Sequence, residues 1–394
     1  MVNKVEAYKS TLILLIIITA VAVDISVPVL TVITEHFGVS SDRSLFIISS
    51  FLAGYGLSMI PVGLLSDRFG RIPVMYIGLT VYILGGVFTV YAPSFEILLW
   101  GRFFQGVGGG VGPVNARAIA RDLASGKDLA VLMSTITMGL FFAPIISPIL
   151  GSQLNQYFGW QAALWVAPVL GLVCIFNVWK NAYRTVSVPD DPTSFFRQFT
   201  QSLQLFYASK QSLWALLIIM VSFAGFQIIL ASASLLMVNI YGIETDKVGI
   251  IFGLTATFMV LATYYNKRKS ATVSPEKLLK YGIILSLLAA VGLFGCYVLG
   301  TVPFWFVWTF IAIYITANGF ILPNTSTIAL DPLSNIAGFA ASVFGAGMIL
   351  SSSLAIMLAA IVYNGTLISI TAGIIICSLL TCLIFFSGSY FRNE

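Results

Sequence analysis

Residues 63–71 read Gly63-Leu-Leu-Ser-Asp67-Arg68-Phe-Gly70-Arg71 and form a short polar connection between two long apolar stretches. Gly63 permits close contact between helices, and Gly70 permits a tight turn. A carboxylate such as that of Asp67 is favoured at the N-terminus of a helix, where it accepts hydrogen bonds. Two arginines beside an apolar segment are typical of the cytoplasmic face of a membrane. The stretch therefore predicts a loop at a membrane surface.

The composition around this loop is that of a membrane protein. Of the 394 residues, 58% are hydrophobic and 9% are charged, whereas a soluble domain carries about 25% charged residues. Because so few charges cannot give the chain a polar surface, lipid is the expected solvent for most of it. The net charge of +5 is modest, and we expect no nucleic-acid partner.

Apolar stretches of about twenty residues, the length that spans a bilayer as a helix, recur along the whole chain. The first is too long for the core of a signal peptide, so we expect it to be retained. The predicted spans are 11–33, 44–65, 73–92, 95–118, 129–152, 162–180, 212–238, 247–265, 278–299, 303–327, 337–362 and 366–386.

One long polar connection, residues 181–211, divides these spans six and six. It contains Arg184, Asp190, Asp191, Pro192 and Arg197. Such a division is expected of two repeats joined by a central loop. The predicted organisation is an all-α membrane protein with twelve spans, comprising a six-helix half at 1–180, a cytoplasmic loop at 181–211 and a second half at 212–394.

The basic residues predict the orientation. With both termini in the cytoplasm, seventeen of the 20 Lys and Arg residues fall in cytoplasmic segments, and only Arg43 and Lys247 fall in outer loops. Cytoplasmic loops of membrane proteins carry this excess. Because a missed span would disrupt the alternation, the bias supports the number of spans as well as the topology.

Asp24 and Arg102 are the two charged residues that fall inside predicted spans and away from their ends. A charge at mid-bilayer costs at least ~2.5 kcal/mol on insertion scales and therefore marks a functional site. At the helical rise, Asp24 lies ~13 Å and Arg102 ~10 Å below the outer surface. Similar depth makes a shared cavity feasible, with a direct or water-bridged pair.

The functional interpretation of this pair is a proton switch. A conformational change that alters the solvent access of Asp24 or its distance from Arg102 would alter its affinity for a proton, and protonation would then bias the conformation. The alternative is a static ion pair between the first and fourth spans.

The chemistry of other classes is not evident. The four cysteines lie inside apolar runs, without CxxC spacing or a neighbouring histidine, and the single histidine, His36, lies in a loop. We read these cysteines as small buried residues and expect neither a metal site nor a cofactor. An enzyme would need a nucleophile and base or a metal cluster, and a channel would need repeated charged or carbonyl-rich rings.

Three motifs resemble those of the major facilitator superfamily. Residues 63–71 match the loop signature G-x-L-x-D-R-x-G-R at every specified position. The resemblance implies a cytoplasmic gate in which Asp67 caps the eleventh span near Ile336 and Arg71 reaches Asp122. Arg102-Phe-Phe-Gln105-Gly106 resembles R-x-x-Q-G, whose arginine the family uses in proton transfer. The glycines that follow are spaced for close helix packing rather than for nucleotide binding.

The fifth span resembles the antiporter motif of drug/proton exporters, with Gly139, Pro144, Pro148 and Gly151 at motif positions and Ala143 where the motif has glycine. A helix merely bent by its two prolines is the alternative. Asp24-Ile-Ser-Val-Pro28-Val-Leu, Arg121-Asp122-Leu and Pro323-Asn324-Thr resemble stretches of Bcr/CflA-type multidrug exporters. Residues 266–280 are basic but lack a second D-R-x-G-R copy, so the resemblance does not settle how the second half is gated.

The resemblance implies a substrate site near the midplane, between the halves. Polar or aromatic residues expected at that depth are Phe51, Tyr55, Asn115, Phe223, Gln227, Ser234, Asn318 and Asn324. Packing between helices is the alternative role for each of them. With one intramembrane acid, a cationic substrate would compete with the proton for Asp24, and an anionic substrate would use Arg102.

The predicted function is a proton-coupled exporter of amphipathic organic compounds in a bacterial inner membrane. Its partners would be a small-molecule substrate, protons and the lipid bilayer, and we expect a monomer. The alternative is a proton-coupled carrier of one specific metabolite or siderophore, with import as its possible direction. A receptor without transport would not need Asp24 and Arg102 together with the gating loop.

Overall fold

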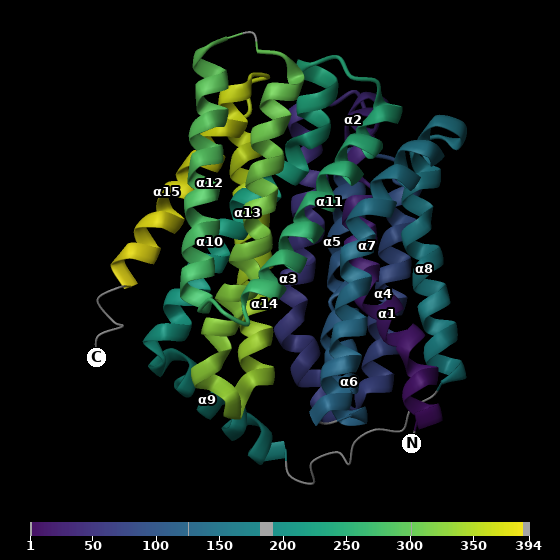
Figure 1. Cartoon of the computed structure of the whole chain (residues 1–394). Coiled ribbons are helices and arrows are strands. Elements are labelled where there is room, and N and C mark those ends of the chain that lie inside the picture. Colours follow the sequence, from purple (N-terminus) through teal and green to yellow (C-terminus); the bar gives the residue numbers. More distant parts are fainter. Residues whose placement is uncertain (1, 125, 182–191, 301, 389–394) are drawn as a thin grey trace.

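The computed structural model describes residues 2–124, 126–181, 192–300 and 302–388. Throughout these ranges the regular structure is helical, without a strand. Figure 1 shows long helices running between an upper end, where α2 and the connection from α12 to α13 lie, and a lower end, where α6 and α9 lie. These two names are kept below.

The helices are defined by their bounds in chain order. They are α1 (Val2–Asp24), η1 (Val27–Val29), α2 (Leu30–His36), η2 (Ser41–Arg43), α3 (Ser44–Phe69), α4 (Arg71–Val90), α5 (Phe95–Gly109), α6 (Val111–Leu123), α7 (Gly126–Phe158), α8 (Trp160–Lys180), α9 (Pro192–Ala208), α10 (Lys210–Ser234), η3 (Leu235–Ile240), α11 (Thr245–Lys269), α12 (Pro275–Val298), α13 (Phe304–Leu330), η4 (Asp331–Ile336), α14 (Ala337–Val362) and α15 (Leu367–Ser387).

Ten helical segments in the described part are long and apolar enough to cross a membrane. They coincide with ten of the expected spans, and 95–118 and 129–152 are the two expected spans outside this set. The first of these two is divided at Gly110 into α5 and α6, each shorter than a span. A helix divided in this way still crosses the bundle from one end to the other (Figure 1).

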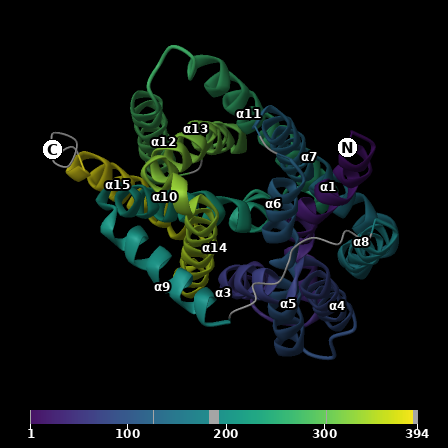
Figure 2. The same ribbon diagram turned by 90° about the horizontal axis from the view of Figure 1, so that it is seen from below.

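Two bundles make up the molecule. The elements from α1 to α8 pack chiefly on one another, and those from α10 to α15 do the same. Two lines of contact join these bundles, one between α3 and α14 and one between α7 and α11. Figure 2 shows both lines, with α3 beside α14 and α7 beside α11. Space is left between the bundles where α1 and α10 face each other.

The first span is broken at Asp24. Pro28 has no N–H to donate to the Asp24 carbonyl four residues earlier, so the regular helix cannot continue. Instead the Ser26 N–H donates to the Val23 carbonyl at 3.1 Å, and the Ser26 hydroxyl donates to the same oxygen at 2.6 Å. The Ala22 carbonyl thereby loses its helical donor. Asp24 is thus the last residue of α1, followed by a short 3₁₀ turn and α2.

Glycines let helices of the first bundle pack closely. A side chain on Gly106 would collide with the Phe51 carbonyl of α3, and one on Gly108 would collide with the Tyr82 amide of α4. Gly110, at the junction of α5 and α6, faces the Ser58 hydroxyl. The spaced glycines therefore serve helix packing, as the sequence predicted.

The connection 181–211 was expected to be a loop, but most of it is helix α9. Phe199 and Phe206, at helical spacing, form one face that packs against Phe339 of α14, with ring centroids 5.5 and 6.5 Å apart. Phe206 also contacts Phe344 at 5.9 Å and is buried. The sequence analysis predicted a loop from the polar residues of this segment and missed the amphipathic pattern of its apolar residues. Residues 182–191 lie outside the described residues.

Candidate substrate cavity and its gates

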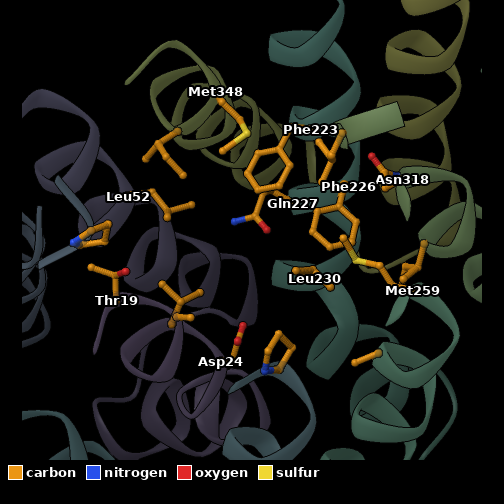
Figure 3. Close-up of a pocket in the computed structure, with 18 of the residues that line it drawn as sticks. Thr19, Asp24, Leu52, Phe223, Phe226, Gln227, Leu230, Met259, Asn318 and Met348 are labelled. Carbon is orange, nitrogen blue, oxygen red and sulfur yellow. The ribbon is translucent and has the colours of Figure 1, made fainter. Parts of the chain in front are cut away.

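A cavity of about 490 Å³ lies between the two bundles. Its walls are mostly apolar, and the polar residues among them are Thr19, Asp24, Tyr55, Arg117, Gln227, Thr263, Asn318 and Ser326. The volume falls within the range of small-molecule sites, which combine apolar walls with a few placed polar groups. Figure 3 shows Asp24 and Gln227 facing this space from opposite walls.

Asp24 reaches the cavity because α1 ends there. Asp24 is 6% exposed and lines the cavity together with Val23 and Ala20 of the same helix. In the described part of the chain its carboxylate has neither an ion-pair nor a hydrogen-bond partner. A buried acid without a partner, facing a cavity, is suited to bind a proton or a cationic group.

Arg102 does not share this cavity, which corrects the expected pair. Its guanidinium is buried behind α1 and donates to the Ala22 carbonyl at 3.0 Å, to the Ser26 hydroxyl at 3.3 Å and to Gln105 Oε1 at 2.9 Å. It also lies 4.8 Å from the centre of the Phe51 ring. Arg102 therefore replaces the donor that Ala22 lost at the break. An anionic substrate in the cavity does not meet this guanidinium.

Arg117 is the basic residue that lines the cavity, and the sequence analysis missed it. It lies in α6, half-buried, on the walls of the central cavity and of a second cavity toward the lower end. The sequence analysis counted it with the basic residues of the cytoplasmic segments, because it lies at the end of the predicted span 95–118. The signal was available in α6, where Pro113 and Arg117 are four residues apart on one helical face.

The first bundle supplies one further predicted residue to the cavity, and two predicted residues lie elsewhere. Tyr55 lines the cavity and has its hydroxyl within hydrogen-bonding reach of Thr19. Phe51 is buried under Arg102. Asn115 is buried, donates to the Val111 carbonyl at 3.0 Å and accepts from Ser66. Both positions point away from the cavity because helix packing sets the rotation of α3 and α6.

The second bundle supplies Phe223, Gln227 and Asn318, all on the cavity wall as expected. Ser234 and Asn324 are buried elsewhere. Aromatic and thioether side chains complete this wall, as Figure 3 shows for Phe226, Met259 and Met348. The second wall is therefore apolar apart from two amides and the hydroxyls of Thr263 and Ser326, and the lining charges come from the first bundle.

The proline-containing segment of α7 lies at the contact with α1 and α11. Pro144 lines the cavity. The Pro148 carbonyl lies against Gly249 of α11, and Gly151 lies against the Ile25 carbonyl at the break of the first span. The surroundings of Gly139 fall outside the described residues. This segment therefore touches both the broken helix and the opposite bundle.

The loop at residues 63–71 forms a polar network at the lower end. Arg71 contacts Asp122 at 3.4 Å, as expected from the motif, and also pairs with Asp67. Gly70 takes a positive φ of 90°, which a glycine adopts without strain. The Arg68 guanidinium carbon lies 5.2 Å from the centre of the Phe69 ring. A Cβ atom added to Gly63 would lie 3.8 Å from Val114 Cγ1, which is an ordinary packing contact.

The expected cap of α14 by Asp67 is not formed in this structure. Helix α14 begins after Ile336 without a side-chain cap. Asp67 turns instead to Arg71 of its own bundle. At the lower end, Arg121 of α6 reaches the start of α14, with its guanidinium against Gly338. The lower ends of the bundles are therefore in contact through Arg121, without the aspartate cap.

An amide pair stands in the second bundle where the basic signature is missing. Asn324 of α13 donates to Asn266 Oδ1 of α11 at 2.7 Å and to the Phe320 carbonyl at 2.7 Å. Both asparagines are buried. The Ser66 and Asn115 pair joins α3 to α6 in the first bundle. The second bundle thus carries a neutral link between helices near its lower end.

The upper end is closed by contacts between the bundles. The Gly249 N–H donates to the Ser152 hydroxyl at 3.0 Å, and the Ser353 hydroxyl donates to the Ser49 carbonyl at 2.8 Å. The first contact lies on the α7–α11 line and the second on the α3–α14 line. The bundles are therefore joined toward the upper end, and Arg117 lines both the central cavity and the lower cavity.

The family model of the Major Facilitator Superfamily matches residues 12–356. Among curated proteins, the chain is 26% identical over 323 residues to the bicyclomycin resistance protein homolog of Haemophilus influenzae, covering 82% of this chain and 81% of the relative. It is 27% identical over 343 residues to multidrug resistance protein D of Escherichia coli, covering 85% and 83%.

Solved structures share the fold. A bacterial homolog of the human lysosomal transporter Spinster, in an inward-facing and unoccupied conformation, aligns with a TM-score of 0.75 at 15% identity over 99% of this chain and 98% of that one. The xylose transporter XylE from Escherichia coli, in a partially occluded inward-open conformation, aligns with a TM-score of 0.75 at 12% identity over 99% and 98%.

Proposed function

Since the chain belongs to the major facilitator superfamily, we propose that it exports amphipathic organic compounds in exchange for protons, by alternating access. It is a multi-pass membrane protein, and its relatives are transporters rather than enzymes. The observation that carries the proposal is Asp24, a carboxylate that has no partner among the described residues and lies on the wall of a cavity between two bundles. The names of the multidrug resistance relatives support the drug-export reading.

The proposed topology has twelve spans in two six-helix halves, with the lower end and both termini in the cytoplasm of a bacterial cell. The charge bias of the loops supports this orientation, and so does the position of the basic loop at the lower end. In this orientation the upper-end contacts close the periplasmic side. The described state is then inward-facing, with substrate admitted from the cytoplasm past Arg117.

Proton coupling follows from the shared position of Asp24. A cationic or hydrogen-donating substrate and a proton would occupy the same carboxylate, so binding of one would weaken binding of the other. Opening the upper end would give Asp24 access to the periplasm, where protonation would release the substrate. Arg102 takes a positioning role in this scheme, because it holds the broken end of α1 on which Asp24 stands.

The test is proton release on binding. Purified protein and its Asp24→Asn variant would be titrated, in weakly buffered detergent solution, with a lipophilic cation such as tetraphenylphosphonium. The wild type is expected to release protons as the cation binds, and Asp24→Asn to bind it without release. Reconstituted vesicles would then show efflux driven by a pH gradient for the wild type alone. Gradient-driven efflux by Asp24→Asn would overturn the proposal.

A dedicated carrier of one metabolite is the second candidate. Arg117 favours it, since a guanidinium that has no partner within the described ranges and lies on the wall can select an anion. Import instead of export would appear as uptake driven by an inward proton gradient in the same vesicles. Accumulation against the substrate gradient in that direction would replace the exporter reading.

A further inference from the structure

The cavity carries one charge of each sign, and both come from the first bundle. Asp24 lies at the end of α1 and Arg117 lies in α6. In the described part of the chain neither side chain forms an ion pair or a hydrogen bond. A ligand with a single charge can pair with only one of these two side chains and leaves the other without a partner of opposite charge.

Arg117 differs from the other arginines of the first bundle. Arg71 has Asp122 and Asp67, Arg102 has the Ala22 carbonyl, and Arg121 lies against Gly338. Arg43 pairs with Glu96 at 3.5 Å. A half-buried guanidinium without a partner is costly, and its fork of donors matches a carboxylate or phosphate. Arg68 and Arg121 are exposed to solvent. In the described part of the chain, Arg117 is thus the half-buried arginine of the first bundle that is left for an anion.

The two charges are separated along the transport axis. Arg117 interacts electrostatically with Tyr55, whose hydroxyl reaches Thr19. Thr19 precedes Asp24 by five residues of α1, or ~7.5 Å of helical rise. The guanidinium therefore lies nearer the lower end than the carboxylate does. A ligand that contacts both needs its charged groups at opposite ends of a spacer.

The opposite wall determines the character of that spacer. Phe223, Phe226, Met259 and Met348 present aromatic and thioether surface on the wall that the second bundle supplies, across from Asp24. Such surface favours a flat apolar body. Gln227 and Asn318 add hydrogen-bonding capacity. The Asn318 Oδ1 atom is buried and has no hydrogen-bond partner in the part of the chain that the structure describes.

On the basis of the proposed function, we infer that the substrates are aromatic zwitterions and that Arg117 binds their anionic group. The cationic nitrogen lies toward Asp24, the anion toward the lower end, and the aromatic body against the second bundle. The proton that replaces the substrate neutralises Asp24 alone, so Arg117 belongs to substrate selection and not to proton coupling.

A matched set of rigid probes tests the inference. The zwitterion is 4′-(aminomethyl)biphenyl-4-carboxylic acid, its methyl ester is the cation, and its N-acetyl derivative is the anion. Kd values would be measured by calorimetry on purified wild type, Arg117→Gln, Arg117→Lys and Lys280→Gln. Lys280 is an exposed cation on α12, away from the cavity, and serves as the matched control.

The zwitterion is expected to bind the wild type most tightly. Arg117→Gln should weaken the zwitterion and the N-acetyl acid about tenfold or more, the effect of one charge-assisted hydrogen bond, and leave the ester within about twofold. Arg117→Lys should fall between, and Lys280→Gln should match the wild type. Binding of the ester shows that each variant is folded.

Three results would overturn the inference. They are an unchanged Kd of the zwitterion in Arg117→Gln, an equal loss for ester and acid, and no binding of any probe to the wild type. Proton release on binding of tetraphenylphosphonium is measured separately on Asp24. If that release persists while the Arg117 effect is absent, proton-coupled export stands and the zwitterion assignment fails. If proton release is absent and the Arg117 effect is present, the zwitterion assignment stands and proton-coupled export fails.

Discussion

Arg102 and Ala22 are joined by a hydrogen bond of 3.0 Å between the guanidinium and a main-chain carbonyl. The carbonyl is free because the Ser26 amide has turned to Val23. Arg102 therefore supplies the donor that the Ala22 carbonyl lacks. Ala22 lies two residues before Asp24, where α1 ends. Main-chain carbonyls thus hold the buried guanidinium of Arg102, and the Asp24 carboxylate lines the cavity.

Replacing Arg102 should destabilise the fold more than it alters the cavity. Arg102→Gln removes donors from Ala22 and Ser26 and is expected to cost about 1.5–3 kcal/mol, the range for hydrogen bonds to charged groups. The measurement is thermal unfolding in detergent, with Arg68→Gln at an exposed position as the control. Unchanged stability together with loss of proton release would instead assign Arg102 directly to proton transfer.

Gly249 should control closure of the upper end. A methyl group there collides with the Pro148 carbonyl of α7, whereas Gly295 of α12 has nothing within 4 Å of the Cβ position. Gly249→Ala is expected to disfavour the closed upper end by about 1–3 kcal/mol, the usual cost of overpacking, and Gly295→Ala to leave it unchanged.

The check is the rate at which an impermeant maleimide, added from the periplasmic side of oriented vesicles, labels a cysteine placed at Leu230 in the cavity. Labelling should accelerate in Gly249→Ala and stay slow in Gly295→Ala. Equal rates in both variants would show that the α7–α11 contact does not close the cavity.

The buried pair of Asn266 and Asn324 should show strong coupling. Replacing either residue by leucine leaves the other amide unsatisfied, which is expected to cost about 1–3 kcal/mol. The double replacement should recover much of that loss, because both polar groups are then gone. A double-mutant cycle by thermal unfolding measures the coupling. Strictly additive losses would mean that the pair does not link α11 to α13.

The ion pair of Arg71 and Asp122 should behave differently, because it is partly exposed to solvent. Asp122→Asn is expected to change stability by less than about 1 kcal/mol. High salt should reproduce that small effect in the wild type and leave the Asn266–Asn324 coupling unchanged. Comparison of unfolding at low and high salt decides the matter, and a salt-dependent asparagine coupling would contradict this account.

Ten of the spans and the contact of Arg71 with Asp122 could be predicted from the sequence. Apolar length depends on local composition, and the loop signature is long enough to be specific. The partner of Arg102 could not be predicted in the same way. Depth alone placed it level with Asp24, but which side of α1 it meets depends on helix rotation, and one residue of error turns a side chain by about 100°.

The same limit explains the divided result for the cavity. Tyr55, Phe223, Gln227 and Asn318 reach it, while Asn115 and Asn324 turn to buried amide contacts. Arg117 was missed because it was counted with the cytoplasmic basic residues at the end of the predicted span 95–118, although α6 continues to Leu123. Whether these residues bind substrate stays a prediction.

The division of the cavity into a charged wall and an apolar wall has an evolutionary consequence. Phe223, Phe226, Met259 and Met348 come from helices that contribute no charge to the cavity. Substitutions among them reshape the surface offered to a ligand without touching Asp24 or the break that presents it. Single mutations in the second bundle can therefore change the substrate that a lineage transports, while Asp24 and the broken helix of the first bundle stay unchanged.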